Sequence, residues 1–223
     1  MIPCLNESRA IGAVVRDVRR HLPTVIVVDD GSADETQAHA REAGAEVIRH
    51  SKSLGKGAAM HDGWMVARER GFEWVLCMDG DGQHASSDIP SFLSCAELTG
   101  AAMVVGNRMA QPAGMPWLRR QVNHWMSRRL SRLSGQTLPD TQNGFRLMQL
   151  CYWEPGVTGA AHFEIESEVL LAYLLQEARV EFVPIEVIYD SERSKIHPWR
   201  DTVRWFRWWH AAARRFEAAR RNT

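Results

Sequence analysis

The 223-residue sequence has no apolar run close to the roughly 18 residues that a membrane-spanning helix requires. Its first residues, Met1-Ile2-Pro3-Cys4, lack the basic and apolar regions of a signal peptide. The four cysteines are scattered and form no C-x-x-C pair, which argues against disulfides and against a zinc site. These absences predict a reduced, globular protein that is cytoplasmic, either free or peripheral on the cytoplasmic face of the membrane.

Two common nucleotide-binding signatures are also missing. The sequence holds no G-x-G-x-x-G fingerprint, so a dinucleotide-dependent oxidoreductase is not expected. Gly55-Lys56-Gly57 is not a Walker A loop, because no Ser or Thr follows the lysine. With 27 basic and 27 acidic residues and no recognised nucleic-acid module, nucleic acid is not an expected partner.

Charge is uneven along the chain although the total is neutral. Residues 111–139 hold five arginines and no acid, and residues 198–223 hold seven arginines against two acids. The rest of the chain is therefore acidic. An acidic body with two basic segments predicts that these segments meet something anionic.

Apolar runs alternate with helical periodicity, which is the pattern of an α/β protein with a mostly parallel sheet. Helices are expected near 11–22, 34–43, 56–70, 88–98, 117–133, 166–176 and 198–223, and strands near 25–28, 46–49, 74–78, 103–106 and 180–188. Only Met1 and Ile2 precede Pro3, whereas strands usually run about five residues. The first strand is expected to be short, either because the start site lies upstream or because part of an edge is lost.

Two aspartates, Asp79 and Asp81, directly follow the apolar run 74–78. A strand that delivers two carboxylates, one residue apart, to a loop predicts a site for Mg²⁺ or Mn²⁺, which prefer oxygen ligands. Gly80 and Gly82 allow the tight turn and close approach that such a loop needs. For this segment taken alone, a solvated Asp-Gly turn is the alternative.

Several short polar motifs follow one another along the chain. They are Ile2-Pro3-Cys4-Leu5-Asn6-Glu7, Val28-Asp29-Asp30-Gly31-Ser32, Gly55-Lys56-Gly57, Asp79-Gly80-Asp81-Gly82-Gln83-His84, Gly106-Asn107-Arg108 and Asn143-Gly144-Phe145-Arg146. In order and spacing they resemble the motifs of the family-2 glycosyltransferases across nearly the whole chain. The resemblance is closest to the branch that transfers sugars to polyprenyl and dolichyl phosphates.

The resemblance implies a GT-A fold and dependence on a nucleotide-sugar and a divalent metal. Residues 1–110 would form the nucleotide-sugar-binding half and residues 111–197 the acceptor half, followed by a basic amphipathic helix at 198–223. Asp79 and Asp81 are then assigned to Mg²⁺ or Mn²⁺, and Gln83 to the neighbourhood of the diphosphate. The metal would act as Lewis acid and template while the sugar C1–O bond breaks.

Asp30 ends a buried strand at the edge of the sheet where ligands bind in open α/β folds. Its carboxylate is the favoured acceptor for the ring N–H of uracil or guanine, ahead of Asp29, and capping of the next helix is the alternative role. By resemblance, Pro3, Leu5 and Glu7 line the base and ribose pocket.

Basic residues of the motifs are candidates for phosphate contact. Lys56 either lies near phosphate or marks the tight start of a helix. Arg108 and Arg146 offer the fixed fork of guanidinium donors that suits phosphate. By resemblance, Arg193 and Lys195 belong to a basic loop that closes over the diphosphate.

Two acids bear on the acceptor. A hydroxyl acceptor needs a carboxylate to remove its proton, and Asp140 is the candidate base. A lipid phosphate is already ionised, so with that acceptor Asp140 would only position other groups. By resemblance Glu168 lies near the acceptor, and a place on a helix surface is the alternative.

Both basic segments predict amphipathic helices, because their apolar residues fall on one helix face and their arginines on another. Tryptophan with arginine is typical of a helix at an anionic lipid interface, which predicts a peripheral membrane contact. The alternative is that both apolar faces pack on the domain.

Together these features predict an inverting hexosyltransferase that uses a UDP-sugar and acts on a polyprenyl phosphate or a similar acceptor at a membrane surface. The alternative within the family is transfer to a saccharide or lipid hydroxyl, with Asp140 as base. The alternative from another class is a non-catalytic membrane adaptor that binds nucleotide-sugars.

Overall fold

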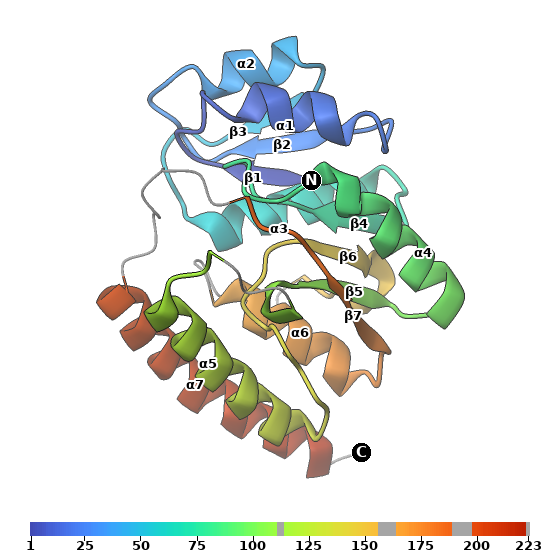
Figure 1. Ribbon diagram of the computed structural model, residues 1–223, viewed down its shortest axis with the longest axis vertical. Coiled ribbons are helices and arrows are strands. Elements are labelled where there is room, and N and C mark those ends of the chain that lie inside the picture. Colours follow the sequence, from blue (N-terminus) through green and yellow to red (C-terminus); the bar gives the residue numbers. More distant parts are fainter. Residues whose placement is uncertain (111–113, 156–163, 189–197, 222–223) are drawn as a thin grey trace.

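A computed structural model describes residues 1–110, 114–155, 164–188 and 198–221 of the chain (Figure 1). Its first three strands are parallel and lie in the order β1-β2-β3. They are β1 (Ile2–Cys4), β2 (Ile26–Asp29) and β3 (Glu46–Arg49), and they alternate along the chain with α1 (Ile11–Val18), α2 (Thr36–Glu42) and α3 (Lys56–Glu69). All residues of β1 and β2 are buried, as expected of central parallel strands.

The second group of strands is mixed and has the order β4-β6-β5-β7. The strands are β4 (Trp74–Cys77), β5 (Met103–Asn107), β6 (Arg146–Gln149) and β7 (Val180–Pro184). Strand β6 is antiparallel to both of its neighbours, whereas β5 and β7 are parallel. The sheet therefore becomes mixed where the second half of the chain joins it.

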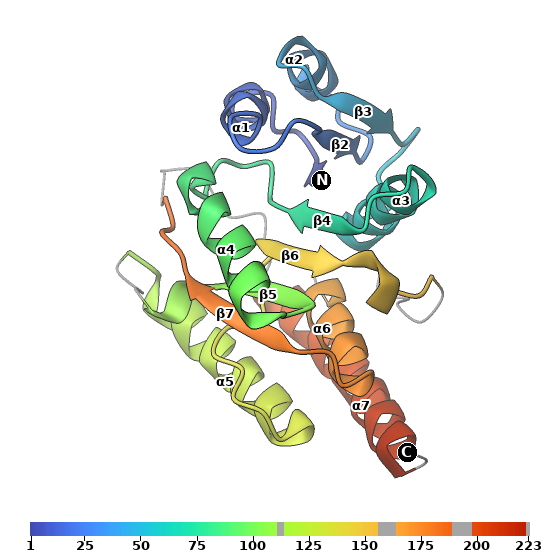
Figure 2. The same cartoon turned by 90° about the vertical axis from the view of Figure 1, so that its right-hand side faces the viewer.

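Met1 connects the two groups of strands. Its α-amino group donates a hydrogen bond to Leu76 O at 2.7 Å, and Met78 N–H donates to Met1 O at 3.1 Å. Strand β1 therefore lies beside β4, and in Figure 2 the N-terminus lies between β2 and β4, with β6, β5 and β7 beyond. The two sheets meet at β1 and β4 and together carry both halves of the chain.

Helices cover both faces of these sheets. The remaining ones are α4 (Ile89–Thr99), α5 (Trp117–Ser134), α6 (Ile165–Leu175) and α7 (Pro198–Arg221), with short 3₁₀ turns at Ser86–Asp88, Arg108–Ala110 and Leu150–Tyr152. Helices α1, α2 and α4 contribute to one apolar cluster, which contains Phe92 and Phe145. Helices α3, α5, α6 and α7 contribute to the other, which contains Trp64, Trp153 and Tyr173.

The apolar face of α7 packs on the domain. Trp205, Trp209 and Phe216 are buried, and Figure 1 shows α7 running beside α5. The Trp125 ring of α5 lies 5.4 Å from the Trp205 ring, centroid to centroid. For these tryptophans, the alternative that the apolar face packs on the domain is therefore the correct one. Within the described residues, no helix combines the length and the apolar character needed to cross a membrane.

The predicted elements are largely confirmed, with three differences. Helix α1 ends at Val18 and not near Leu22, because the residues that follow form turns with hydrogen bonds between residues three apart. Strand β6 was not expected, because its four residues follow a polar loop and carry no alternation of their own. Strand β7 ends at Pro184 and not at Ile188, since its parallel partner β5 also ends there, and Val187 instead bridges to His84. The first strand has three residues, as short as expected.

Candidate functional site

The motif residues gather at one edge of the sheet. Strands β1, β2, β4 and β5 end at this edge, and the antiparallel strand β6 begins there. Cys77 of β4 pairs with Arg146 of β6, so Asp79 and Gly144 meet just beyond that pair. The edge therefore brings together motifs that are far apart in the sequence.

Lys56 forms two ion pairs at the centre of this edge. Its Nζ lies 2.7 Å from Asp79 Oδ1 and 2.8 Å from Glu166 Oε1. Lys56 begins α3, Asp79 follows β4, and Glu166 lies in the first turn of α6, where it is 3% exposed. One ammonium group thus connects the first half of the chain to the second.

This cluster stabilises its charged forms. Burial alone would raise the pKa of Asp79, but Lys56 and then His84 lower it to about 2. Burial alone would lower the pKa of Lys56, but Asp79 and Glu166 raise it above its ordinary value. Both groups are therefore ionised at neutral pH.

Gly144 allows the close approach of the loop before β6 to this cluster. A Cβ atom at that position would lie 2.8 Å from Asp79 Oδ1 and 3.0 Å from Lys56 Nζ. The first distance is shorter than real Cβ contacts and the second is tight, so a side chain would push the ends of the Asp79 and Lys56 side chains aside. The glycine of the Asn143-Gly144-Phe145-Arg146 motif therefore leaves room for this ion pair.

The loop after β4 brings both aspartates near His84. Asp81 Oδ1 accepts a hydrogen bond from Gln83 N–H at 3.0 Å, and His84 Nδ1 accepts one from Asp79 N–H at 3.3 Å. Burial lowers the pKa of His84, although Asp79 and Asp81 both lie close enough to favour its charged form. The two carboxylates therefore flank one buried imidazole.

The carboxylates of this loop suit a divalent metal that is shared with a substrate. Within the described part of the chain, no group of three His, Cys, Asp or Glu side chains converges as a metal cage. Mg²⁺ commonly binds one or two carboxylates, several waters and substrate phosphates. Asp79 and Asp81 fit that arrangement, in which the diphosphate completes the metal's ligands.

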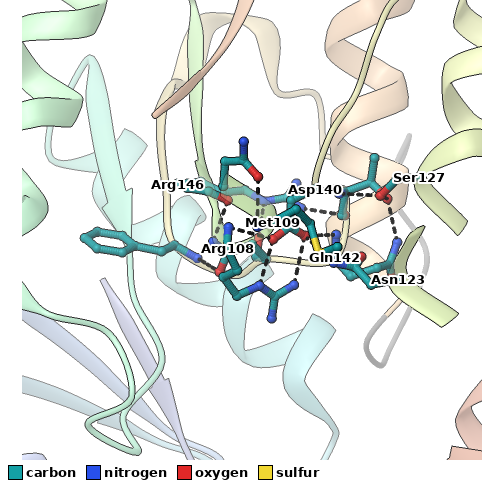
Figure 3. Close-up of polar contacts among 12 residues, drawn as sticks. Arg108, Met109, Asn123, Ser127, Asp140, Gln142 and Arg146 are labelled. Atoms are coloured by element: carbon teal, nitrogen blue, oxygen red, sulfur yellow. Dashed lines mark hydrogen bonds and ion pairs between the residues drawn. The ribbon is translucent and has the colours of Figure 1, made fainter. Parts of the chain in front are cut away.

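Asp140 is the centre of a buried network (Figure 3). Arg108 donates to it through Nε at 2.8 Å, Nη2 at 2.9 Å and its main-chain N–H at 3.1 Å. Asn123 of α5 and the main-chain N–H of Gln142 donate as well. Burial alone would raise the pKa of this carboxyl, but the Arg108 guanidinium holds it below its ordinary range.

Arg146 is also buried and donates to main-chain carbonyls. Its Nε bonds to Asn143 O at 2.7 Å, its Nη2 to Thr141 O at 3.1 Å, and its Nη1 to Glu166 O. The guanidinium therefore holds the loop before β6 against the start of α6, the helix that carries Glu166. Figure 3 shows Arg146 and Asp140 in the same close-up.

Asp30 accepts four hydrogen bonds. His50 Nδ1 and Leu54 N–H donate to Oδ1, at 2.7 and 2.8 Å, while the Ser53 hydroxyl and Gly55 N–H donate to Oδ2, at 2.7 and 2.9 Å. Burial alone would raise the pKa of Asp30, but the hydrogen bonds from Leu54 and His50 lower it. Asp30 thus fixes the turn that leads into Lys56.

Asp29 has a different environment. Its Oδ1 accepts a hydrogen bond from Ser32 N–H at 2.9 Å, which holds the loop after β2. Its Oδ2 is buried and has no hydrogen-bond partner, and Arg49 Nε lies 3.6 Å away. Asp29 is therefore hydrogen-bonded through one oxygen only, while the other forms an ion pair with Arg49.

The other predicted donor residues lie at the end of β1. Pro3 is buried within the strand, opposite Val28 of β2. Leu5 is half-buried just beyond it, and Glu7 is buried with its main-chain N–H bonded to Thr36. This segment lies next to the loop after β2, because Asn6 N–H donates to Ser32.

Glu168 lies away from the Lys56 cluster. Its Oε1 accepts a hydrogen bond from Trp208 Nε1 of α7 at 3.4 Å. Glu166, two residues earlier in the same acidic run, contacts Lys56 instead. Arg193 and Lys195, predicted to close over the diphosphate, lie outside the described residues.

Three site residues were missed from the sequence: Glu166, His50 and Asn123. The acidic run at 164–168 was noticed, but the phase of α6 decides which acid faces Lys56. His50 and Asn123 belong to no motif, and only their hydrogen bonds to Asp30 and Asp140 reveal them.

Comparisons with known proteins show the family of the chain. The family model described as Glycosyl transferase family 2 matches residues 1–150. Over 212 residues the chain is 28% identical to the UDP-N-acetylglucosamine–dolichyl-phosphate N-acetylglucosaminyltransferase of Methanococcus voltae. This match covers 85% of this chain and 84% of that protein. Over 158 residues the chain is 30% identical to the polyprenol monophosphomannose synthase of Mycolicibacterium smegmatis. This match covers 66% of this chain and 59% of that protein.

A solved structure has the same fold. Glucosyl-3-phosphoglycerate synthase from Mycobacterium tuberculosis, in complex with Mn²⁺, uridine diphosphate and phosphoglyceric acid, matches with a TM-score of 0.66 at 19% identity. The match covers 98% of this chain and 75% of that chain. The GT-A fold expected from the sequence is confirmed.

Proposed function

Because this chain belongs to glycosyl transferase family 2, we propose that it transfers a hexose, with inversion, from a UDP-sugar to a polyprenyl phosphate. The two curated relatives support this choice, since their names give a UDP-sugar donor and dolichyl or polyprenol phosphate chemistry. The donor would bind at the sheet edge, with the base near β1 and β2 and the diphosphate near Lys56.

The environment of Asp140 is the observation that favours a phosphate acceptor over a hydroxyl. Its carboxylate accepts five hydrogen bonds, three of them from Arg108, and its pKa is lowered. A carboxylate with its lone pairs occupied is a poor general base at neutral pH. A phosphate acceptor is already ionised and needs no such base. Asp140 would then position Arg108.

The diphosphate side of the reaction would depend on Lys56 and the two aspartates. Mg²⁺ or Mn²⁺, held by Asp79, Asp81 and the substrate, would offset charge on the departing diphosphate. The Lys56 ammonium contacts the Asp79 carboxylate and adds a second positive charge beside the metal position. Gln83, in the same loop, would contact the diphosphate, and Arg146 would hold the loop that faces it.

The nucleotide base of the donor would be recognised at the end of β2. All four acceptor positions of Asp30 are occupied, so a base N–H must replace one of these donors. The Ser53 hydroxyl can rotate away without moving the main chain, which makes it the donor to exchange. Pro3, Leu5 and Glu7 would line the pocket from the end of β1.

A membrane contact would place the acceptor near the site. Trp117 and Leu118 are 72% and 58% exposed in the first turn of α5. The helix carries five arginines and no acid, and four of these arginines are exposed. We assign peripheral contact with the cytoplasmic face of the membrane to this end of α5, since Trp205 and Trp209 of α7 are buried.

The test is release of uridine diphosphate. Purified protein is incubated with Mn²⁺, a panel of UDP-sugars and a polyprenyl phosphate in detergent, and released nucleotide is measured. Turnover that requires both substrates, and that Asp81→Ala abolishes, would support the proposal. If no donor gives turnover above the Asp81→Ala background, the transferase proposal is wrong for this chain.

A further inference from the structure

His50 lies between two carboxylates, and each of its ring nitrogens contacts one of them. Its Nδ1 is 2.7 Å from Asp30 Oδ1, and its Nε2 is 2.9 Å from Asp62 Oδ2. His50 follows β3 and is 8% exposed, Asp30 follows β2, and Asp62 lies on α3. The ring therefore links three separate elements.

The two contacts fix how many protons the ring carries. An ionised carboxylate only accepts hydrogen bonds, and a neutral imidazole has only one N–H to donate. Both hydrogen bonds therefore form together only when the ring is an imidazolium. A neutral ring would release either Asp30 or Asp62.

Asp30 connects the His50 ring to the Lys56 cluster at the sheet edge. The same carboxylate accepts hydrogen bonds from the main-chain N–H groups of Leu54 and Gly55. Gly55 has a φ of +102° and directly precedes Lys56, whose ammonium contacts Asp79. The orientation of Asp30 therefore sets the turn that presents Lys56.

We propose that His50 is a positioning residue of the donor site. As an imidazolium held by Asp62, it orients the Asp30 carboxylate and, through it, the turn that presents Lys56. Loss of the hydrogen bond to Asp30 loosens this turn and weakens nucleotide binding. The inference rests on the proposed function, in that Asp30 and Lys56 belong to the donor site.

The charged groups around the ring agree with this role. Asp30 faces it from the end of β2 and Asp62 faces it from α3, where His61 Nδ1 also lies 3.9 Å from Asp62 Oδ1. The neighbouring Arg49 points elsewhere, toward Gln37, Ser32 and Asp29. Asp30 and Asp62 are therefore the charged groups that contact the ring.

Two variants separate positioning from simple stabilisation. His50→Asn keeps an amide donor near the Nδ1 position, which reaches Asp30, and His50→Gln keeps one near the Nε2 position, which reaches Asp62. Each retains one of the two hydrogen bonds. Binding of uridine diphosphate with Mn²⁺ would be measured by calorimetry for both variants and for the wild type.

The positioning role predicts a difference between these variants. His50→Asn should bind within about threefold of the wild type, because it keeps the donor to Asp30. His50→Gln should lose about tenfold, because it keeps only the contact with Asp62.

Equal affinities for both His50 variants and wild type would overturn the inference and leave His50 a structural residue. Nitrogen-15 shifts of the His50 ring in wild type are a second measurement that needs no variant. The two hydrogen bonds require two protonated ring nitrogens, and one unprotonated nitrogen would also overturn the inference. Absence of any nucleotide binding by wild type would contradict the proposed function, and with it this role.

Discussion

The Lys56 ammonium lies 2.7 Å from Asp79 Oδ1, so the first carboxylate of the D-x-D sequence has a counter-ion supplied by the protein. The same ammonium contacts Glu166 on α6. Because Lys56 begins α3 and Glu166 belongs to the second half of the chain, this contact ties the two halves together at the site. The first predictions concern that cluster.

Replacing Lys56 by glutamine should impair both stability and transfer. Asp79 and Glu166 would stay close together without a positive charge, which should lower the free energy of unfolding by about 2 kcal/mol. Urea unfolding and release of uridine diphosphate would measure the two effects. Lys52→Gln is the matched control, since Lys52 is exposed in the preceding loop. Wild-type stability and rate in Lys56→Gln would show that the ion pairs are unimportant.

The same cluster predicts a loss of stability in acid. The pKa of Asp79 is lowered from 3.8 to about 2, so its contribution is complete above its ordinary pKa and is lost as pH falls through about 2. Lys56→Gln removes the main favourable charge. The difference in unfolding free energy between wild type and this variant should therefore narrow as pH falls from about 5 to about 2. A constant difference over that range would contradict the assignment.

Gly144→Ala should disable the site while Gly12→Ala should not. A Cβ at position 144 would lie 2.8 Å from Asp79 Oδ1, whereas a Cβ at position 12 meets nothing closer than 3.5 Å. We expect at least a roughly tenfold fall in transfer rate for Gly144→Ala, because displacement by about 1 Å at a site is costly. Equal rates for both variants would show that the loop before β6 has room to adjust.

Asp140→Asn separates the two acceptor classes. If Asp140 positions Arg108, the variant should lose stability by about 3 kcal/mol, since it leaves a buried guanidinium without its counter-charge. The double variant with Arg108→Gln should then be less destabilised than the two single effects combined. Unchanged stability and donor binding, with near-complete loss of rate, would instead favour Asp140 as base for a hydroxyl acceptor.

The membrane contact is tested at the first turn of α5. Trp117→Ala with Leu118→Ala should reduce sedimentation with anionic vesicles by about tenfold or more, since two large apolar side chains no longer enter the interface. Leu98→Ala is the control, because Leu98 is 82% exposed at the end of α4. Unchanged sedimentation of the α5 variant would refute the contact.

The local parts of this protein could be predicted from its sequence. Helices α3, α4 and α5 lie within two residues of their expected bounds, because an amphipathic period and a terminal glycine act within a few residues. The order of the motifs was sufficient for the family. The place of Asp79 after a buried strand indicated the candidate metal site, which stays a prediction.

The tertiary structure decided what each charged residue contacts. Lys56 and Glu166 are 110 positions apart, and neither sequence neighbourhood indicates that they meet. The same holds for Arg108 with Asp140, for His50 with Asp30, and for the buried face of α7. Residue type and spacing fix which groups are charged, whereas desolvation and pairing depend on long-range packing. Only the folded chain therefore distinguishes a residue free for substrate from one held by its neighbours.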